Sequence, residues 1–261
     1  MSLPALLAGA EPLTSGFRLA IPEDWHQGRT AYGGFSAALA LAAGGQTGGG
    51  GGRPLRWAAG RFVRPLFGAI EARARVLRAG RNATWVAAEV LRDGEVGLTA
   101  TFAFMGPVAS ALRLNERPVP AGLIAPEQAK ERVVKYAPTF LSAHFDVRFA
   151  LPPAETRSPE LCLWVRPRAR EGMDDAMALL LSADALPPGV FPLLVPEVPP
   201  VSSMIWQANL LPPAPATRDG WWLLRSRGDY AENGCSSQVM EVWNADGQPV
   251  MAGMQSIALF G

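Results

Sequence analysis

The stretch AMALLLSADALPP, residues 176–188, combines an apolar run, one carboxylate and a pair of prolines. Alanine, leucine and methionine are strong helix formers, so residues 176–181 predict a helix. Pro187 and Pro188 cannot continue this helix, because proline lacks an amide hydrogen and clashes with the preceding turn. Asp184 therefore lies near the end of an otherwise apolar helix. It is either a surface carboxylate or a desolvated group that acts on water or a proton.

Length and composition limit the class of protein. A chain of 261 residues is one large domain or two of ordinary size, and its content of 49% hydrophobic and 18% charged residues is typical of a globular protein. The net charge of +1 favours neither nucleic acid nor an anionic membrane as a partner. The N-terminus has no signal-peptide pattern, and the apolar stretches are too short for a membrane span. We therefore expect a cytoplasmic protein.

The cysteines and histidines give no sign of a metal site. Cys162 and Cys235 have no CxxC spacing, and His26 and His144 lie far apart in sequence. We expect reduced thiols and structural histidines. No metal and no cofactor are expected.

A second apolar helix is predicted over residues 35–43, directly after Gly33 and Gly34. Glycine permits close approach of the backbone, and the amides of a helix's first turn have no internal partners. The pair is therefore either an anion or oxyanion site or a tight strand-to-helix turn. The glycine-rich residues 44–52 predict a flexible loop.

The strand patterns divide the chain into two similar halves. Strands are predicted over residues 17–21, 56–63, 69–77, 83–91 and 96–105, and again over 145–149, 161–166, 201–208, 221–226, 237–243 and 250–260. Each half has an Asp-Gly turn before its last strand, at Asp93-Gly94 and Asp246-Gly247. We expect an α+β fold in which residues 1–106 and 144–261 form two similar units, joined by residues 107–143. Two such sheets placed edge to edge would wrap the two helices.

The two halves differ at two polar positions. Counted back from the glycines that end the halves, Gln255 falls opposite Ala100. The helix over residues 35–43 has no carboxylate to match Asp184. A glutamine inside an apolar strand needs hydrogen-bond partners when it is buried. The asymmetry favours a functional role for Asp184 and Gln255 over a role in the fold.

The sequence resembles the bacterial acyl-CoA thioesterase II family, which has the double hotdog fold. The matching segments are RTAYGG (residues 29–34), FVRP (62–65), LRDG (91–94), Asp184 on the second helix, and DG through MQ (246–255) at the C-terminal strand. The resemblance implies hydrolysis of a fatty acyl-CoA to free acid and CoA, within lipid metabolism. It also implies a homo-oligomer, a dimer or larger.

The resemblance also implies a set of site residues. The family's catalytic aspartate, hydroxyl residue and glutamine correspond to Asp184, Ser202 and Gln255. Ser202 is placed by counting back from a proline that ends the strand, and a slip of one residue gives Val201 or Ser203 on the other sheet face. The three groups would hold a water, with Asp184 as general base or orienting group. The amides of Gly33 and Gly34 would stabilise the oxyanion.

Substrate contacts follow as further expectations. Candidates for an apolar acyl slot are Trp206, Met204, Phe35 and Met254, with ordinary core packing as the alternative. Candidates for the CoA phosphates are Arg61, Arg64 and Arg73, with solvated surface charges as the alternative.

Two other functions stay open. One is an acyl-CoA or lipid binding protein on the same fold without turnover. The other is an enoyl-CoA hydratase, which needs an aspartate and a histidine close together. Asp24 and His26 are the near pair in this sequence.

Overall fold

A computed structural model describes residues 1–48, 50–132 and 138–260. The larger strands of the first half are β1 (Glu11–Leu13), β2 (Gly16–Ile21), β5 (Leu55–Phe62), β6 (Gly68–Ala79), β7 (Ala83–Arg92) and β8 (Glu95–Met105). Those of the second half are β9 (Phe145–Phe149), β10 (Glu160–Pro167), β11 (Val201–Leu210), β12 (Trp222–Glu232), β13 (Cys235–Asn244) and β14 (Pro249–Leu259). Two short strands, β3 (His26–Gln27) and β4 (Thr30–Ala31), pair separately.

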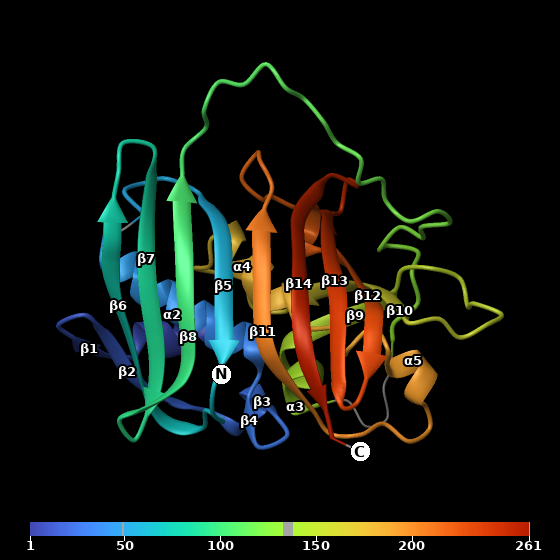
Figure 1. Ribbon diagram of the computed structural model, residues 1–261, viewed down its shortest axis with the longest axis horizontal. Helices are drawn as coiled ribbons and strands as arrows, with labels where there is room; N and C mark the ends of the chain where they lie inside the picture. Colours follow the sequence, from blue (N-terminus) through green and yellow to red (C-terminus); the bar gives the residue numbers. More distant parts are fainter. Residues whose placement is uncertain (49, 133–137, 261) are drawn as a thin grey trace.

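One continuous antiparallel sheet runs through both halves (Figure 1). Within the described chain it contains twelve strands, in the order β1-β2-β6-β7-β8-β5-β11-β14-β13-β12-β10-β9. The halves meet where β5 pairs with β11, with Ala59 opposite Gln207. The second half therefore repeats the strand order of the first in reverse. The predicted edge-to-edge junction and the α+β class are confirmed.

Two helices lie against the same face of the sheet, behind it in Figure 1. They are α2 (Gly33–Gln46) and α4 (Asp175–Ala183), and they contact each other. Helix α2 extends beyond the predicted range at both ends, including residues 44–46 of the predicted loop. Glycine is a poor helix former, but Gly44 is buried against the side chains of β7 and β8, so packing overrides propensity here. Gly49, in the same predicted loop, lies outside the described residues.

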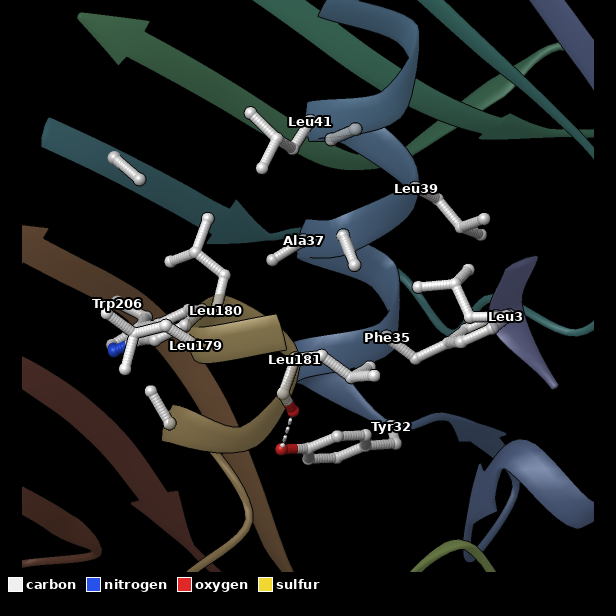
Figure 2. Close-up of a cluster of buried hydrophobic side chains, with 14 of the residues drawn as sticks. Leu3, Tyr32, Phe35, Ala37, Leu39, Leu41, Leu179, Leu180, Leu181 and Trp206 are labelled. Atoms are coloured by element: carbon white, nitrogen blue, oxygen red, sulfur yellow. Dashed lines mark hydrogen bonds between the residues drawn. The ribbon is translucent and has the colours of Figure 1, made fainter. Parts of the chain in front are cut away.

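The main core lies between the helices and the sheet. Figure 2 shows Leu41 and Ala37 of α2 on the side toward Leu180 of α4, with Trp206 of β11 beside the leucines. Helix α2 is buried along most of its length, as expected for a helix with no polar face. This packing fixes the ends of α2 and α4 relative to each other.

Short helices complete the fold. They are α1 (Leu3–Ala8), α3 (Thr139–His144), α5 (Phe191–Leu194) and two 3₁₀ turns, η1 (Glu23–Trp25) and η2 (Arg218–Gly220). Helix α1 buries Leu3 and Leu6 in the core and so anchors the first residues of the chain.

The predicted connection, residues 107–143, leaves β8 and arches over one end of the sheet to the second half (Figure 1). It contains most of α3, and residues 133–137 lie outside the described residues. Within the described chain, no helix has the length and hydropathy needed to cross a membrane.

Candidate active site

The end of α4 meets the start of α2, and glycines permit the contact. Asp184 is the C-cap residue directly after α4. A Cβ atom on Gly33 would lie 2.4 Å from its Oδ2 atom, and one on Gly34 would lie 2.6 Å from the carbonyl oxygen of Leu181. Real Cβ contacts are longer, so a larger residue at either position would force the helices apart. The predicted close approach of the glycine pair is confirmed, and its partner is the other helix.

Tyr32 holds the two helix ends together. Its hydroxyl donates a hydrogen bond of 2.8 Å to the carbonyl oxygen of Leu181, in the last turn of α4 (Figure 2). The side chain is fully buried and stacks on Phe140. Burial and the nearby Asp184 carboxylate both raise the pKa of Tyr32, so the phenol stays neutral. Tyr32 therefore locks the helix end that carries Asp184.

Gln255 connects the sheet to Asp184. Its Nε2 atom donates to Oδ1 of Asp184 at 2.8 Å and to Oγ of Ser203 at 2.7 Å. Its Oε1 atom accepts from Nε2 of Gln238 at 2.6 Å. The glutamine is 3% exposed, so these bonds replace its hydration. The predicted proximity of Asp184 and Gln255 is confirmed.

The hydroxyl beside Gln255 belongs to Ser203, not to Ser202. Strict alternation back from the inward Trp206 places Met204 and Ser202 on the inner face. A β-bulge between Ser203 and Ile205 adds one residue to β11 and reverses this alternation. Ser202 is an exposed residue that also lines the adjoining cavity, and its hydroxyl contacts the backbone of its neighbour. The hydroxyl that contacts Gln255 therefore lies one residue beyond the position given by counting, at the alternative Ser203.

Burial dominates the electrostatics of Asp184. The side chain is 9% exposed, and desolvation raises its pKa to about 7. Hydrogen bonding from Gln255 and the backbone amide of Gly34 opposes this rise without cancelling it. The start of α2 also favours the ionised form, because the N-terminus of a helix carries partial positive charge. The carboxyl group thus changes its protonation state near neutral pH.

A cavity of about 160 Å³ opens at this cluster and draws on both halves of the chain. Its lining includes Asp184, Ser203 and Gln255 from the second half, and Gly33, Phe62 and Arg64 from the first. Gly34 is outside this lining, and its amide hydrogen-bonds Asp184. Gly33 is the first residue of α2, where backbone amides have no acceptor within the helix, and it lines the cavity.

The proposed acyl-slot residues lie elsewhere. Trp206 is 3% exposed and packs in the core, as does Phe35. Met204 and Met254 are exposed on the sheet. None of the four is part of the cavity lining. Core packing, the alternative reading, describes Trp206 and Phe35.

The three candidate arginines differ in their position relative to the cavity. Arg64 lies at the cavity and pairs with Glu95. Arg61 is exposed on β5, and Arg73 pairs with Glu71 on β6. Arg64 is thus the one of the three that lines the cavity.

Asp24 pairs with His144 rather than with His26. The distance from His144 Nε2 to Asp24 Oδ2 is 3.3 Å, and the imidazole stacks on Trp25. Neither residue lines the cavity beside Asp184. The Asp–His arrangement of a hydratase is therefore not present at this cavity.

Sequence reasoning missed Gln238 and Tyr32. Gln238 is an isolated glutamine at an inward position of an alternating strand, and that pattern was the available signal. Tyr32 directly precedes the glycine pair and was read only as part of the family's motif.

Comparison with protein families identifies the class of protein. A model of the acyl-CoA thioesterase N-terminal domain matches residues 21–105, and one of the acyl-CoA thioesterase C-terminal domain matches residues 114–259. The chain belongs to the acyl-CoA thioesterase family. No curated protein matches it.

Solved structures show the same fold. A conserved protein of unknown function with hot dog fold from Alicyclobacillus acidocaldarius has a TM-score of 0.83 at 18% identity, covering 100% of this chain and 99% of that one. An acyl-CoA thioesterase II, TesB2, from Mycobacterium marinum has a TM-score of 0.75 at 17% identity, covering 98% of each chain. A tesB protein from Mycobacterium avium subs paratuberculosis has a TM-score of 0.74 at 16% identity, covering 100% of each chain. The predicted double hotdog fold is confirmed.

Proposed function

We propose that the protein hydrolyses acyl-CoA thioesters to a free acid and CoA, with Asp184 as the general base. The observation that carries this proposal is the buried cluster of Asp184, Gln255 and Ser203 at a cavity formed by both halves. A buried carboxyl group with a pKa of about 7 suits a base that works at neutral pH. Membership of the thioesterase family supports the substrate class.

The reaction needs one water and one thioester. Asp184 takes a proton from the water as its oxygen attacks the thioester carbonyl carbon. The carbon–sulfur bond of the tetrahedral intermediate then breaks, and the CoA sulfur leaves as a thiolate that receives the proton. Atoms and charge balance, with carboxylic acid and thiol as products.

Gln255 and Ser203 have defined parts in this mechanism. Both amide hydrogens of Gln255 are engaged, one by Asp184 and one by Ser203. Ser203 therefore accepts from Gln255 and keeps its own hydrogen for the water or the carbonyl oxygen. The Gly33 amide is the backbone donor for the oxyanion, because it borders the cavity and Gly34 does not.

Arg64 is the residue we assign to a phosphate of CoA. It stands exposed at the cavity with Glu95 as its present partner, so an incoming phosphate would compete for it. A cytoplasmic location, a role in lipid metabolism and a homo-oligomeric state stay predictions.

A thiol-release assay with Asp184→Asn tests this function. Acyl-CoA esters of several chain lengths are mixed with the protein and a thiol reagent. We expect the parent chain to release free thiol and the variant to lose about 10³-fold in kcat, the size of a general-base contribution. The asparagine keeps the size of the side chain, so a preserved thermal unfolding temperature is the control for folding.

Two outcomes contradict the proposal. An active Asp184→Asn variant removes Asp184 from the mechanism. Acyl-CoA that co-purifies intact with a parent chain that releases no thiol supports the binding-protein alternative.

A further inference from the structure

Gln238 lies behind Gln255 on the inner face of β13 and is 1% exposed. Its Nε2 atom donates to Oε1 of Gln255 at 2.6 Å. Its Oε1 atom accepts from the backbone amide of Gly189 at 2.8 Å. A hydrogen-bond chain therefore runs from Gly189 through Gln238 and Gln255 to Asp184.

The hydrogen bonds from Gly189 to Asp184 have a fixed donor-to-acceptor direction. A glutamine amide presents an acceptor on one side and two donors on the other, and a half-turn exchanges them. A backbone N–H can only donate, so Gly189 requires the oxygen of Gln238 on its side. The NH₂ group of Gln238 then faces Gln255 and requires its oxygen there. The NH₂ group of Gln255 is consequently directed at Asp184 and Ser203.

Gly189, the first donor in this series of hydrogen bonds, is held firmly in place. Gly189 lies five residues after Asp184, in the loop that follows α4. A Cβ atom on Gly189 would lie 2.5 Å from the backbone nitrogen of Gly228 in β12, so the loop packs directly on the sheet. Gln238 sits opposite Gly228 in the β12–β13 register. The loop, the two glutamines and Asp184 thus form a closed ring of covalent and hydrogen bonds.

The fold itself does not need these glutamines. In the first half, the inward side chains from Val86 to Val90 and from Leu98 to Phe102 are apolar. The matching strands of the second half carry Gln238 and Gln255 in the same kind of position. Buried amides are costly unless they are fully paired, and these two glutamines are paired with each other and with the cluster around Asp184.

We propose that Gln238 is a positioning residue that fixes the amide of Gln255 with its donors toward Asp184 and Ser203. This inference rests on the proposed function for its catalytic consequence. Without Gln238, Gln255 is free to turn its oxygen toward the Asp184 carboxylate. That orientation repels the ionised base and takes a donor away from Ser203.

Gln238→Met and Gln238→Leu test this role, because both keep the bulk of the side chain and remove its amide. We expect kcat to fall about tenfold, the effect of losing one hydrogen bond in the transition state, with KM changed by less than about twofold. The pH midpoint of kcat/KM rises, since the bond from Gln255 favours the ionised form of Asp184. Tyr32, the titratable neighbour of Asp184, is unchanged in these variants.

A titration of the Asp184 carboxyl carbon by ¹³C NMR gives a readout that needs no turnover. The signal is assigned by its loss in Asp184→Asn. We expect its midpoint to rise by about one pH unit in either Gln238 variant. The matched control is Gln207→Met, a half-buried glutamine on the opposite face of β11, which should keep the parental kcat and midpoint.

The outcomes separate the two proposals. A folded Gln238 variant with parental kcat and parental Asp184 midpoint overturns the role of Gln238. A parent chain that releases no thiol overturns the proposed hydrolysis, and the NMR midpoint still decides whether Gln238 orients Gln255. If Gln238→Met does not fold, Gln238→Leu is the deciding variant. If neither variant folds, the purely positioning role of Gln238 is overturned.

Discussion

At the scale of single residues, the proposed role of Asp184 as a base combines two requirements that are usually in conflict. A base must hold a proton well enough to remove it from water, and it must be ionised at the working pH. Burial supplies the first property and hydrogen bonding preserves the second, which leaves the pKa at about 7. An exposed aspartate would be ionised but too weak a base.

The pH dependence of activity follows from this pKa. In the proposed mechanism Asp184 acts in its ionised form, and its raised pKa means that protonation persists up to about pH 7. We therefore expect kcat/KM to rise with pH, reach half of its maximum near pH 7 and stay level above it. Initial rates between pH 5 and pH 9 would measure this, with a CoA ester that is stable in the buffer. A midpoint near 4 would contradict a desolvated base.

The two neighbouring serines should differ sharply. Ser203→Ala removes the hydroxyl that bonds Gln255 at the cavity, and we expect kcat to fall about 100-fold, as for loss of an oxyanion donor. Ser202→Ala changes an exposed side chain and should stay within about twofold of the parent. Steady-state kinetics of the two variants would decide between them. Equal losses would show that the register of β11 is different in solution.

At the scale of elements, the start of α2 must stay bare because the end of α4 touches it. Gly33→Ala adds a Cβ atom that would meet Oδ2 of Asp184 at 2.4 Å and the ring of Phe62 at 3.2 Å. We expect kcat/KM to fall at least tenfold. Displacement of the Asp184 carboxylate needs to raise the activation free energy by only about 1.4 kcal/mol for a loss of this size. Kinetics together with thermal unfolding would measure this effect.

Gly45→Ala is the matched control in the same helix. Nothing lies within 4 Å of the added Cβ atom, and alanine is a better helix former than glycine. We expect it to stabilise the fold by up to about 1 kcal/mol and to leave activity unchanged. A similar loss of activity in both variants would mean that α2 responds to substitution as a whole, not through Asp184.

Sequence patterns predicted the long elements better than the short ones. Strand β9 was predicted with both ends correct, because apolar alternation is strong there. The other large strands were predicted to within about two residues at each end, apart from β1, which was missed, and β12, which continues from the predicted end at residue 226 to Glu232. Helices α1 and α3 were missed. Each has six residues and depends on burying Leu3 or Phe140 in the core, which local propensity does not report.

The candidate site was also predictable only in part, because some of its residues have a signal in the sequence and others depend on contacts between distant segments. Asp184 and Gln255 stood out because the repeat has no polar residue to match them. The bulge in β11 has no local sequence signal, so counting selected Ser202 instead of Ser203. Gln238 and Tyr32 act through other residues, and their roles depend on contacts between distant segments.

At the scale of the whole molecule, the halves share one architecture and differ in what they contribute. The first half supplies the glycines at the start of α2 and part of the cavity wall. The second half supplies every side chain of the Asp184 cluster. Because β5 and β11 join the halves into one sheet, the site exists only when both are folded together.

The apolar inner face of the first half has a consequence for stoichiometry. A protein with two equivalent halves would present two binding sites per chain, but here one of the two positions is filled by alanine, valine and phenylalanine. We expect an S-alkyl-CoA thioether, which has no carbonyl to hydrolyse, to saturate at one molecule per chain in a calorimetric titration. A ratio of two would mean that the first half has kept a working pocket of its own. The duplicated chain thus has one half that carries the polar residues of the candidate site and one half whose matching positions are apolar.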